Sequence, residues 1–321
     1  MRRFYPAVRL THRFYTAVCA LAVLFVAATN GSAAQAYIII DAKSGHVLQQ
    51  SNQRDKRQVG SLTKVATAMV VLDWAEKRGG DLGQVATIPP EAFAGTENLI
   101  GFQPGDTAEL RDLLYAALVQ SDNIAAYTLA QHVGQAVQGV VPPAAGGPVA
   151  TFVSQMNALA ATLKMERTRF VNPSGIDAGV KPVPFSTAAD MARLTRYAMS
   201  NAGFRFYVSQ KERQISYTRA GAQQSYMLRN TNELLGTNGV EGVKTGRTAR
   251  AGDCLILSAQ RKADVIKHNE TSATVLPRHI IIVLLGSTNR FAEGNQLLNI
   301  GWQLFDQWAA AGRPVDPKKV L

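Results

Sequence analysis

Segments typical of β-strands lie near both ends of this chain, and segments with helical periodicity fill its middle. Near the start, two short strand-like runs flank the turn Lys43-Ser44-Gly45, which is the pattern of a β-hairpin. Further strand-like runs cover residues 239–244, 253–259 and 280–286, followed by a helical stretch at 289–308. The central helical stretches cover residues 61–78, 108–119, 122–133, 150–163 and 187–200. The simplest arrangement is an α+β fold, in which an antiparallel sheet built from both termini is flanked by helices and carries an inserted helical subdomain.

The first 36 residues have the features of a secretory signal peptide. Residues 1–16 contain four arginines and no acidic residue, an apolar run follows at 17–28, and the segment ends in Ala34-Gln35-Ala36. The apolar run is shorter than the roughly 20 residues that span a bilayer, which favours cleavage after Ala36 over an uncleaved anchor. We therefore expect export to the periplasm or cell envelope, a catalytic domain at 37–309, a polar tail at 310–321, and no stable membrane anchor after cleavage.

Charge and cysteine content narrow the classes of partner. The formal net charge is +11, which suits the anionic surroundings of a cell envelope. No dense Lys/Arg run is interleaved with aromatic residues, so we expect no nucleic-acid partner. Outside the leader Cys254 is the only cysteine, and its apolar surroundings favour a small buried side chain over a nucleophile.

The first chemical motif is Ser61-Leu62-Thr63-Lys64, at the start of the first long helical stretch. Residues three apart on a helix share a face, so the Ser61 hydroxyl and the Lys64 amine can touch. Serine becomes a strong nucleophile when a base takes its proton, and a lysine of lowered pKa can be that base. Alone, the motif is a weak signal and favours a helix N-cap serine followed by a solvated lysine.

The second motif is Ser121-Asp122-Asn123, at the junction of two helical stretches. All three residue types cap helices well, and taken singly the motif favours a cap. The functional interpretation gives Ser121 a role in proton transfer and lets Asn123 hydrogen-bond the peptide of a substrate.

The third motif is Lys244-Thr245-Gly246, which ends a strand-like run. A cation and a hydroxyl beside a glycine can hold a carboxylate while an extended peptide approaches the strand edge. Taken alone, the motif favours a strand-end turn with an exposed lysine. The three motifs in this order and these contexts are the combined signature of β-lactamases and penicillin-binding proteins.

Together with other segments, these motifs make the chain resemble the low-molecular-mass penicillin-binding proteins, the serine-type D-alanyl-D-alanine carboxypeptidases. The resemblance extends over residues 36–305, and its further segments are Pro104-Gly105-Asp106-Thr107, residues 111–115, residues 170–177, and Asn230-Thr231-Asn232. It implies a fold similar to that of β-lactamases and DD-peptidases. It also implies hydrolysis of the terminal D-Ala-D-Ala bond of peptidoglycan stem peptides through an acyl-enzyme, without cofactor or metal.

The resemblance also assigns roles to residues. It implies that Ser61 is the acylated nucleophile and the site of a covalent β-lactam adduct, that Lys64 is its base, and that Ser121 assists proton transfer. It further implies that the substrate-binding residues are Asn123, Lys244, Thr245, Gly246, Arg247 and Arg290. In this set Arg247 supplies an oxyanion-hole N–H together with that of Ser61, and Arg290 lies near the carboxylate site or is simply a surface arginine.

Several alternatives remain open at this stage. The deacylating glutamate of a β-lactamase has no match in the region of Glu166, so we expect penicillin to acylate Ser61 and leave slowly. No serine lies in a G-x-S-x-G motif, which disfavours a Ser-His-Asp hydrolase, and the five scattered histidines fit no H-E-x-x-H zinc site. A D,D-endopeptidase that cleaves cross-links and a non-catalytic envelope protein that binds penicillin or peptidoglycan also fit the motifs. The Gly/Pro-rich loop at 139–148 and the insertion at 262–278 have no assigned role.

Overall fold

A computed structural model describes residues 34–141 and 144–321 of the chain. Most of the predicted signal peptide, residues 1–33, lies outside the described residues, as do two residues of the predicted loop at 139–148. Within the described part, no helix is both long enough and apolar enough to span a membrane.

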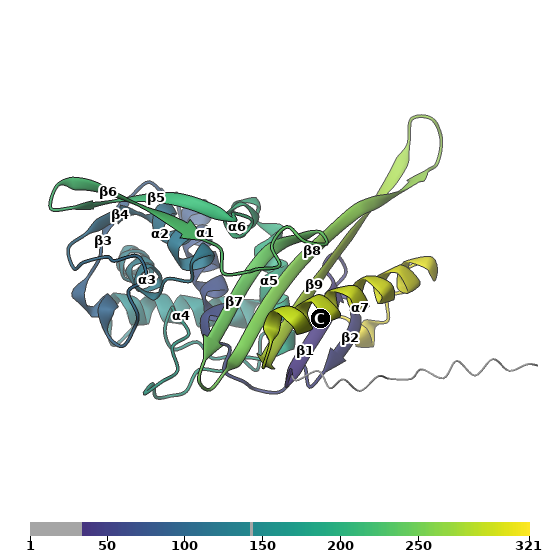
Figure 1. Ribbon diagram of the computed structural model, residues 1–321, viewed down its shortest axis with the longest axis horizontal. Coiled ribbons are helices and arrows are strands. Elements are labelled where there is room, and N and C mark those ends of the chain that lie inside the picture. Colours follow the sequence, from purple (N-terminus) through teal and green to yellow (C-terminus); the bar gives the residue numbers. More distant parts are fainter. Residues whose placement is uncertain (1–33, 142–143) are drawn as a thin grey trace, which may run out of the picture. The chain divides into compact units, whose positions relative to one another are not determined.

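A five-stranded antiparallel sheet joins the start of the described chain to its end (Figure 1). Its strands are β1 (Ala36–Asp41), β2 (Val47–Ser51), β7 (Val240–Thr248), β8 (Gly252–Lys267) and β9 (Ala273–Ser287). They are ordered β2-β1-β9-β8-β7, so β1 pairs with β9 and β7 forms one edge of the sheet. The predicted sheet built from both termini is therefore confirmed.

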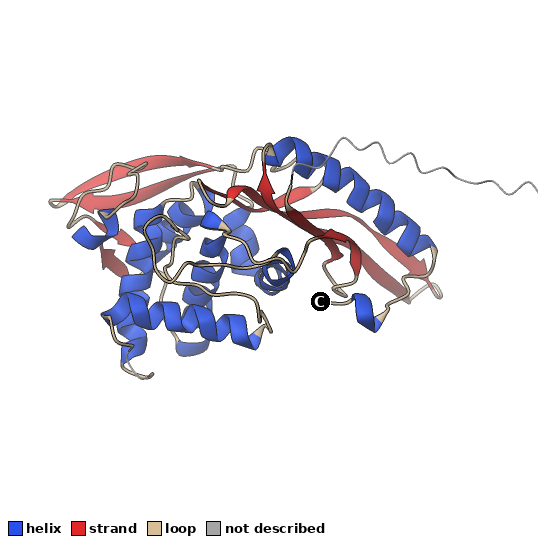
Figure 2. Cartoon of the chain, turned by 90° about the horizontal axis from the view of Figure 1, so that it is seen from below, coloured by secondary structure: helices blue, strands red, loops and turns tan. Residues whose placement is uncertain are grey.

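Both faces of this sheet are covered, which explains why its strands are apolar runs rather than alternating ones. Helix α7 (Arg290–Ala310) lies along one face, where Ile39 belongs to the same buried cluster as Trp302. The neighbouring side chains of Ile38 and Ile40 point the other way, into the larger core formed with the inserted helices. Figure 2 shows α7 on one side of the sheet and the remaining helices on the other.

The inserted region contains six helices and two short 3₁₀ turns. They are η1 (Gly60–Thr63), α1 (Lys64–Arg78), η2 (Pro90–Phe93), α2 (Leu110–Val119), α3 (Asn123–Gln138), α4 (Gly147–Thr162), α5 (Ala188–Ser200) and α6 (Ala202–Val208). The five predicted central helices are therefore present, with shifted ends. The first one begins as a 3₁₀ turn, so that α1 itself starts at Lys64 and not at Ser61.

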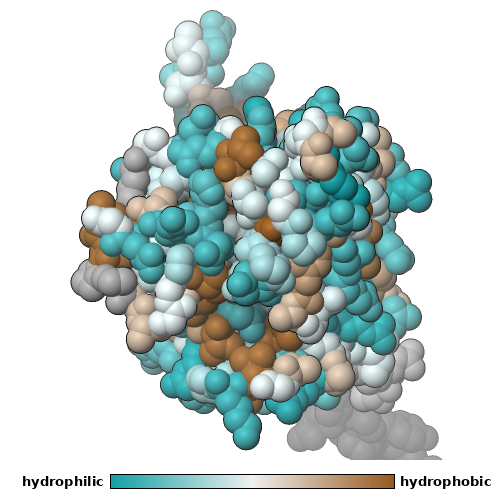
Figure 3. All heavy atoms as spheres, turned by 90° about the vertical axis from the view of Figure 1, so that its left-hand side faces the viewer, coloured by the Kyte–Doolittle hydropathy of each residue, from teal (hydrophilic) through white to brown (hydrophobic). Residues whose placement is uncertain are grey.

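A second, four-stranded sheet in this region was not predicted from the sequence. Its strands are β3 (Val85–Thr87), β4 (Thr107–Glu109), β5 (Glu212–Arg219) and β6 (Ala222–Arg229), in that order. Two of them have only three residues, and in β6 only Leu228 is buried, so the apolar signal is weak. Seen from this end of the molecule, the surface is mostly polar, with small apolar patches between the polar side chains (Figure 3).

Two segments beyond the core have definite structure. The insertion at 262–278 extends β8 and β9 into a two-stranded ribbon that projects past β7 (Figure 1). The side chains of Val265 and Val275 on this ribbon are exposed. The predicted polar tail contains the 3₁₀ turn η3 (Pro317–Lys319), and Val320 forms an isolated bridge to His46 near the start of the chain.

Candidate active site

The local fold places Ser61 and Lys64 side by side, as their spacing predicts. Ser61 lies in η1 and Lys64 is the first residue of α1, and the Lys64 Nζ is 2.8 Å from the Ser61 Oγ. The Lys64 side chain is fully buried, whereas Ser61 is partly exposed. The hydroxyl therefore faces an accessible side of the site while the amine lies behind it.

Three oxygen atoms surround the Lys64 amine. Besides Ser61, they are the side-chain Oδ1 of Asn123 at 2.6 Å and the backbone carbonyl of Ser174 at 3.1 Å. An amide or peptide carbonyl oxygen can only accept hydrogen bonds. A neutral amine that donates its two N–H groups to these two oxygens keeps its lone pair for the Ser61 hydroxyl. The geometry therefore suits proton transfer from Ser61 to Lys64.

Because the Lys64 amine is buried, a large fraction of it can be neutral near physiological pH. Loss of hydration lowers the pKa of Lys64 to about 7, and the carboxylate of Asp122 opposes part of this shift. Burial in turn raises the pKa of Asp122 to about 6. A lysine with this pKa is neutral in about half of the molecules at pH 7, whereas an ordinary lysine is almost entirely charged.

The Ser121-Asp122-Asn123 motif joins α2 to α3. Ser121 has a φ of 67°, in the left-handed region that non-glycine residues rarely adopt and that often marks functional sites. Asp122 is the N-cap of α3 and accepts from the N–H of Ala125, so the predicted capping role is present as well. Within the described chain the Ser121 hydroxyl has no hydrogen-bond partner, and the contact of this motif with Lys64 is made by Asn123.

Thr96 fixes the amide of Asn123 from the other side. The Asn123 Nδ2 donates to the Thr96 Oγ1 at 2.7 Å, so its Oδ1 is the atom that faces Lys64. Thr96 could not be predicted from the sequence, because a single threonine in a polar loop has no distinguishing pattern. The carbonyl of Ser174 was not predicted either, although the Asn172-Pro173-Ser174-Gly175 stretch has the composition of a turn.

The third motif lies on β7, the edge strand beside η1. Lys244 is fully buried and its Nζ donates to the carbonyl of Thr245 at 2.9 Å, so the alternative of an exposed lysine is wrong. Burial, and then the positive charges of Lys64 and Arg290, lower the pKa of Lys244 well below its ordinary value. The hydroxyls of Thr245 and Thr231 are 2.6 Å apart.

Glycines allow the three segments to approach this closely. A Cβ on Gly246 would lie 2.7 Å from the carbonyl oxygen of Val59, and one on Gly60 would lie 3.1 Å from the N of Arg247. Gly175 has a φ of +86°, and a Cβ there would lie 2.0 Å from the carbonyl oxygen of Gly60. From the sequence, Gly246 was expected to let a substrate approach the strand. In the structure, its missing side chain also lets η1 pack closely against β7.

Arg290 lies beside the end of the third motif. Its Nη1 donates to the carbonyl of Gly246 at 3.0 Å and is 3.4 Å from the Asp253 carboxylate, which Arg247 also approaches at 3.4 Å. The Arg290 side chain is only 18% exposed, which excludes the alternative of a simple surface arginine.

Other reactive side chains lie in structural settings. Cys254 is buried in β8, and burial raises its pKa to about 11, so it is not a thiolate nucleophile. His46 stacks on Trp308, and His279 contacts Glu241 and Ser258. No group of three or more potential metal ligands occurs among the described residues.

A comparison with protein families shows which family this chain and its candidate active site belong to. The family model for D-alanyl-D-alanine carboxypeptidases of the Peptidase S11 type matches residues 25–268. The chain belongs to this family. That range contains all three motifs, so the match and the site geometry concern the same residues.

Relatives in the D-alanyl-D-alanine carboxypeptidase family share a quarter to a third of their residues with this chain. D-alanyl-D-alanine carboxypeptidase DacC of Escherichia coli is 31% identical over 85% of this chain and 62% of the relative. A D-alanyl-D-alanine endopeptidase of Pseudomonas aeruginosa is 31% identical over 68% of this chain and 65% of that protein. The chain spans only 54% of DacF of Bacillus subtilis, at 25% identity. The matched part of the chain thus spans about half to two thirds of the length of each of these three relatives.

Solved structures of the family have the same fold. The crystal structure of the Streptomyces K15 DD-transpeptidase is 27% identical, with a TM-score of 0.71 over 84% of this chain and 97% of that one. Penicillin-binding protein D2 of Listeria monocytogenes, in its cefotaxime-bound form, is 25% identical, with a TM-score of 0.65. The predicted similarity to the β-lactamase and DD-peptidase fold is confirmed.

Proposed function

We propose that this protein is a serine-type D-alanyl-D-alanine carboxypeptidase that hydrolyses the terminal D-Ala-D-Ala bond of peptidoglycan stem peptides. The observation that carries the proposal is the Lys64 amine, buried behind Ser61 and held by two oxygens that can only accept hydrogen bonds. This arrangement leaves the lone pair of the neutral amine for the Ser61 proton. A lysine with a purely structural role would not need a neutral amine with a free lone pair.

In the proposed acylation step, Lys64 takes the proton of Ser61 as Oγ attacks the carbonyl of the penultimate D-alanine. The N–H groups of Ser61 and Arg247 stabilise the oxyanion, and the closeness of Gly60 to the Arg247 N supports this pairing. Collapse of the tetrahedral intermediate breaks the peptide bond, and the proton passes to the leaving amine through Lys64 and Ser121. Water then hydrolyses the ester, which releases the peptide acid and restores Ser61.

We infer that the substrate lies along the free edge of β7, with its terminal carboxylate held by Lys244, Thr245, Gly246 and Arg290. A carboxylate that arrives beside Lys244 stabilises the ammonium form, so binding is expected to return a proton to that amine. The positive charge restored on Lys244 then disfavours protonation of the Lys64 amine. Substrate binding thus helps to keep the base neutral when it is needed.

A free carboxylate at this position favours the carboxypeptidase over the endopeptidase. Two basic side chains, Lys244 and Arg290, lie beside the end of the third motif, where we propose that a terminal D-alanine places its carboxylate. In a cross-link, a second stem peptide lies beyond the bond to be cut, and it is a longer substituent than the single D-alanine of an uncrosslinked stem. The non-catalytic alternative explains neither the buried base nor its two fixed acceptors.

A β-lactam is proposed to acylate Ser61 and to leave slowly. The segment of residues 170–177 contacts Lys64 through the carbonyl of Ser174, and its one carboxylate, Asp177, is buried and accepts a hydrogen bond from the Thr248 hydroxyl. Glu166 is exposed and lines a different pocket. Sustained, rapid penicillin hydrolysis by the purified protein would contradict this.

We also propose export to the periplasm or cell envelope with removal of the leader. The contacts favour cleavage after residue 33 over cleavage after Ala36. The N–H of Ala34 donates to buried Glu293 at 2.8 Å, that of Gln35 donates to the carbonyl of Leu285, and Ala36 is fully buried in β1. Cleavage there leaves a new α-ammonium beside a carboxylate. The intact mass of the exported protein distinguishes this start from one three residues later.

The test is the release of free D-alanine from a soluble peptide that ends in D-Ala-D-Ala. The wild type is expected to release it, and Ser61→Ala is expected to lose both this activity and labelling by a fluorescent penicillin. Ser272→Ala, which changes an exposed serine in the ribbon at 262–278, serves as the matched control and should behave like the wild type. Equal D-alanine release by Ser61→Ala and the wild type would refute the proposal.

A further inference from the structure

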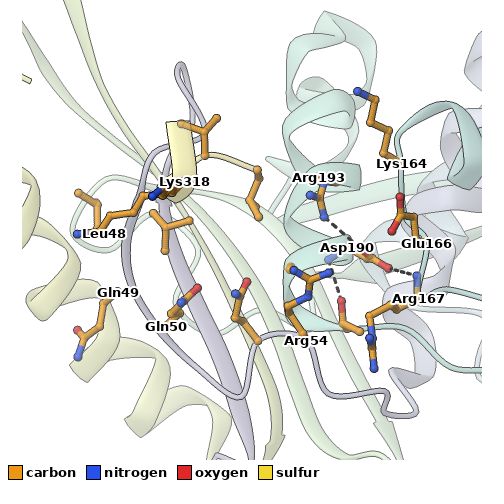
Figure 4. A pocket seen from close by; sticks show the side chains of 17 residues that line it. Leu48, Gln49, Gln50, Arg54, Lys164, Glu166, Arg167, Asp190, Arg193 and Lys318 are labelled. Atoms are coloured by element: carbon orange, nitrogen blue, oxygen red, sulfur yellow. Dashed lines mark hydrogen bonds and ion pairs between the residues drawn. The ribbon is translucent and has the colours of Figure 1, made fainter. Parts of the chain in front are cut away.

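A second pocket, formed by other segments of the chain, carries a cluster of positive charge. It has a volume of about 370 Å³ and lies between the strand β2 with its following loop, the turn after α4, the start of α5 and the last residues of the chain. Figure 4 shows Lys318, Gln49 and Gln50 on one side, with Arg54, Arg167 and Arg193 on the other. None of the residues assigned to Ser61 chemistry lines it.

The charge of this pocket is strongly unbalanced. Six cationic side chains and two acidic ones line it: Arg54, Lys164, Arg167, Arg193, Lys318 and Lys319, against Glu166 and Asp190. Asp190 is already bound to Arg193 at 3.2 Å and to the backbone N–H of Arg167 at 3.0 Å. In the described part of the chain, the other five cations form no ion pair with a carboxylate. The pocket therefore has cations available for an anionic ligand.

Amide side chains add a second kind of group to the pocket. Gln49, Gln50 and Gln53 line it, and the oxygen of an amide side chain accepts a hydrogen bond from an N–H donor. A peptide carboxylate supplies both the negative charge and the N–H groups, whereas an ionised phosphate polymer supplies only the charge.

The pocket lies within reach of a polymer that occupies the active site. Arg54 precedes Ser61 by seven residues and Arg167 precedes Ser174 by seven, so each wall continues directly into the catalytic region. Seven residues span at most roughly 25 Å even when fully extended. A polymer that carries many stem peptides can therefore present one to Ser61 and another to this pocket.

We propose that this pocket is a second binding site for carboxylate-bearing stem peptides of the polymeric substrate. The inference rests on the proposed function and extends it. Binding at two sites on one polymer raises the apparent affinity for peptidoglycan without changing the chemistry on a single small peptide. Arginine side chains suit this role because their planar guanidinium groups bind carboxylates through two parallel hydrogen bonds.

The test uses the catalytically inert Ser61→Ala protein and sedimentation with purified sacculi. Changing Arg54, Lys164 and Arg167 to Gln removes three exposed charges from the pocket. Changing Lys211, Lys262 and Lys267 to Gln removes three exposed charges elsewhere, as the matched control. Binding should weaken about tenfold in the pocket variant, roughly twofold for each exposed ion pair, and much less in the control. Equal weakening in both variants would overturn the proposal, because it would indicate general charge attraction.

Two further arms identify the ligand. A soluble stem peptide with free carboxylates should displace the inert protein from sacculi better than the same peptide with amidated carboxylates. Polyphosphate that displaces it more effectively than the free peptide would overturn the assignment to peptide carboxylates.

Kinetics separate the pocket from the active site. With Ser61 restored, the pocket variant should release D-alanine from a small peptide at the wild-type rate but act about tenfold more slowly on dilute sacculi, the same factor as its loss of binding. Equal losses on both substrates would contradict a separate site. If neither protein cleaves the small peptide, the proposed function fails, while sedimentation of the inert protein still tests the pocket.

Discussion

Two regions of this protein gather basic side chains, and they differ in their exposure to water. In the candidate active site Lys64 and Lys244 are fully buried, and burial lowers the pKa of both. In the second pocket Lys164 and Arg54 are exposed to water. The comparison shows that desolvation, and not the number of positive charges, makes a lysine into a base.

The two regions also differ in how firmly their groups are held. Two of the three residues whose oxygens surround Lys64 are held by further hydrogen bonds: Asn123 donates to Thr96, and the turn that carries Ser174 donates to Asn172. The cations of the second pocket, apart from Arg193, have no such partner in the described chain. Fixed partners suit a reaction that needs one geometry, and free cations suit a ligand of variable position.

The largest difference should appear when one lysine is replaced in each region. Lys64→Met removes the base and should lower the rate of Ser61 acylation on the order of 10² to 10⁴-fold, the usual contribution of general base catalysis. Lys164→Met is the matched control in the second pocket and should acylate at the wild-type rate. Stopped-flow labelling with a fluorescent penicillin measures both. Similar rates for the two variants would remove the distinction between the regions.

The tightness of the active site can be tested through its glycines. Gly175→Ala places a Cβ 2.0 Å from the Gly60 carbonyl oxygen in a backbone conformation of positive φ. Gly179 also has a positive φ, but nothing lies within 4 Å of its Cβ position. Both changes should cost about 1–3 kcal/mol of backbone strain, and only Gly175→Ala should add a steric clash. Its Tm should therefore fall further, and equal Tm values would show that the approach of these segments is not tight.

The hydrogen bond between Thr96 and Asn123 should have a moderate effect. Thr96→Val removes it while keeping the size of the side chain, and the loss of a neutral hydrogen bond of about 1 kcal/mol corresponds to a roughly fivefold lower acylation rate. Thr96→Ser keeps the hydroxyl and should restore most of the rate. A rate for Thr96→Val equal to that of the wild type would mean that Asn123 is positioned without Thr96.

The smallest expected effect concerns the pH dependence and not the maximal rate. The Asp122 carboxylate favours the charged form of Lys64 and so raises its pKa. Asp122→Asn keeps a good N-cap residue but removes this charge, so the pKa of Lys64 should fall and the pH midpoint of acylation should move to lower pH. A midpoint that moves upward would contradict the electrostatic account.

The sequence predicted much of this molecule for identifiable reasons. The apolar runs at both ends indicated the five-stranded sheet, and the spacing of Ser61 and Lys64 predicted their contact. The small sheet was missed because its strands are short or mostly polar. The Ser174 carbonyl could not be predicted, because a backbone atom leaves no mark in the sequence. The close approach of Gly175 to the Gly60 carbonyl could not be predicted either, because it depends on tertiary contacts that no local sequence pattern encodes.

The charged pocket also could not be predicted from the sequence. Its cations come from four separate segments, and the chain as a whole is basic, so no local charge run marks them. Only folding brings Arg54, Arg167 and Lys318 to one cavity (Figure 4).

The most direct test of the central claim is the second-order rate constant for acylation of Ser61 by a fluorescent penicillin, measured from about pH 5 to about pH 10. If a neutral Lys64 is the base, the rate should rise roughly tenfold per pH unit at low pH and level off above a midpoint near the Lys64 pKa of about 7. A midpoint near the ordinary lysine pKa of about 10.4, or a rate independent of pH over this range, would contradict the claim.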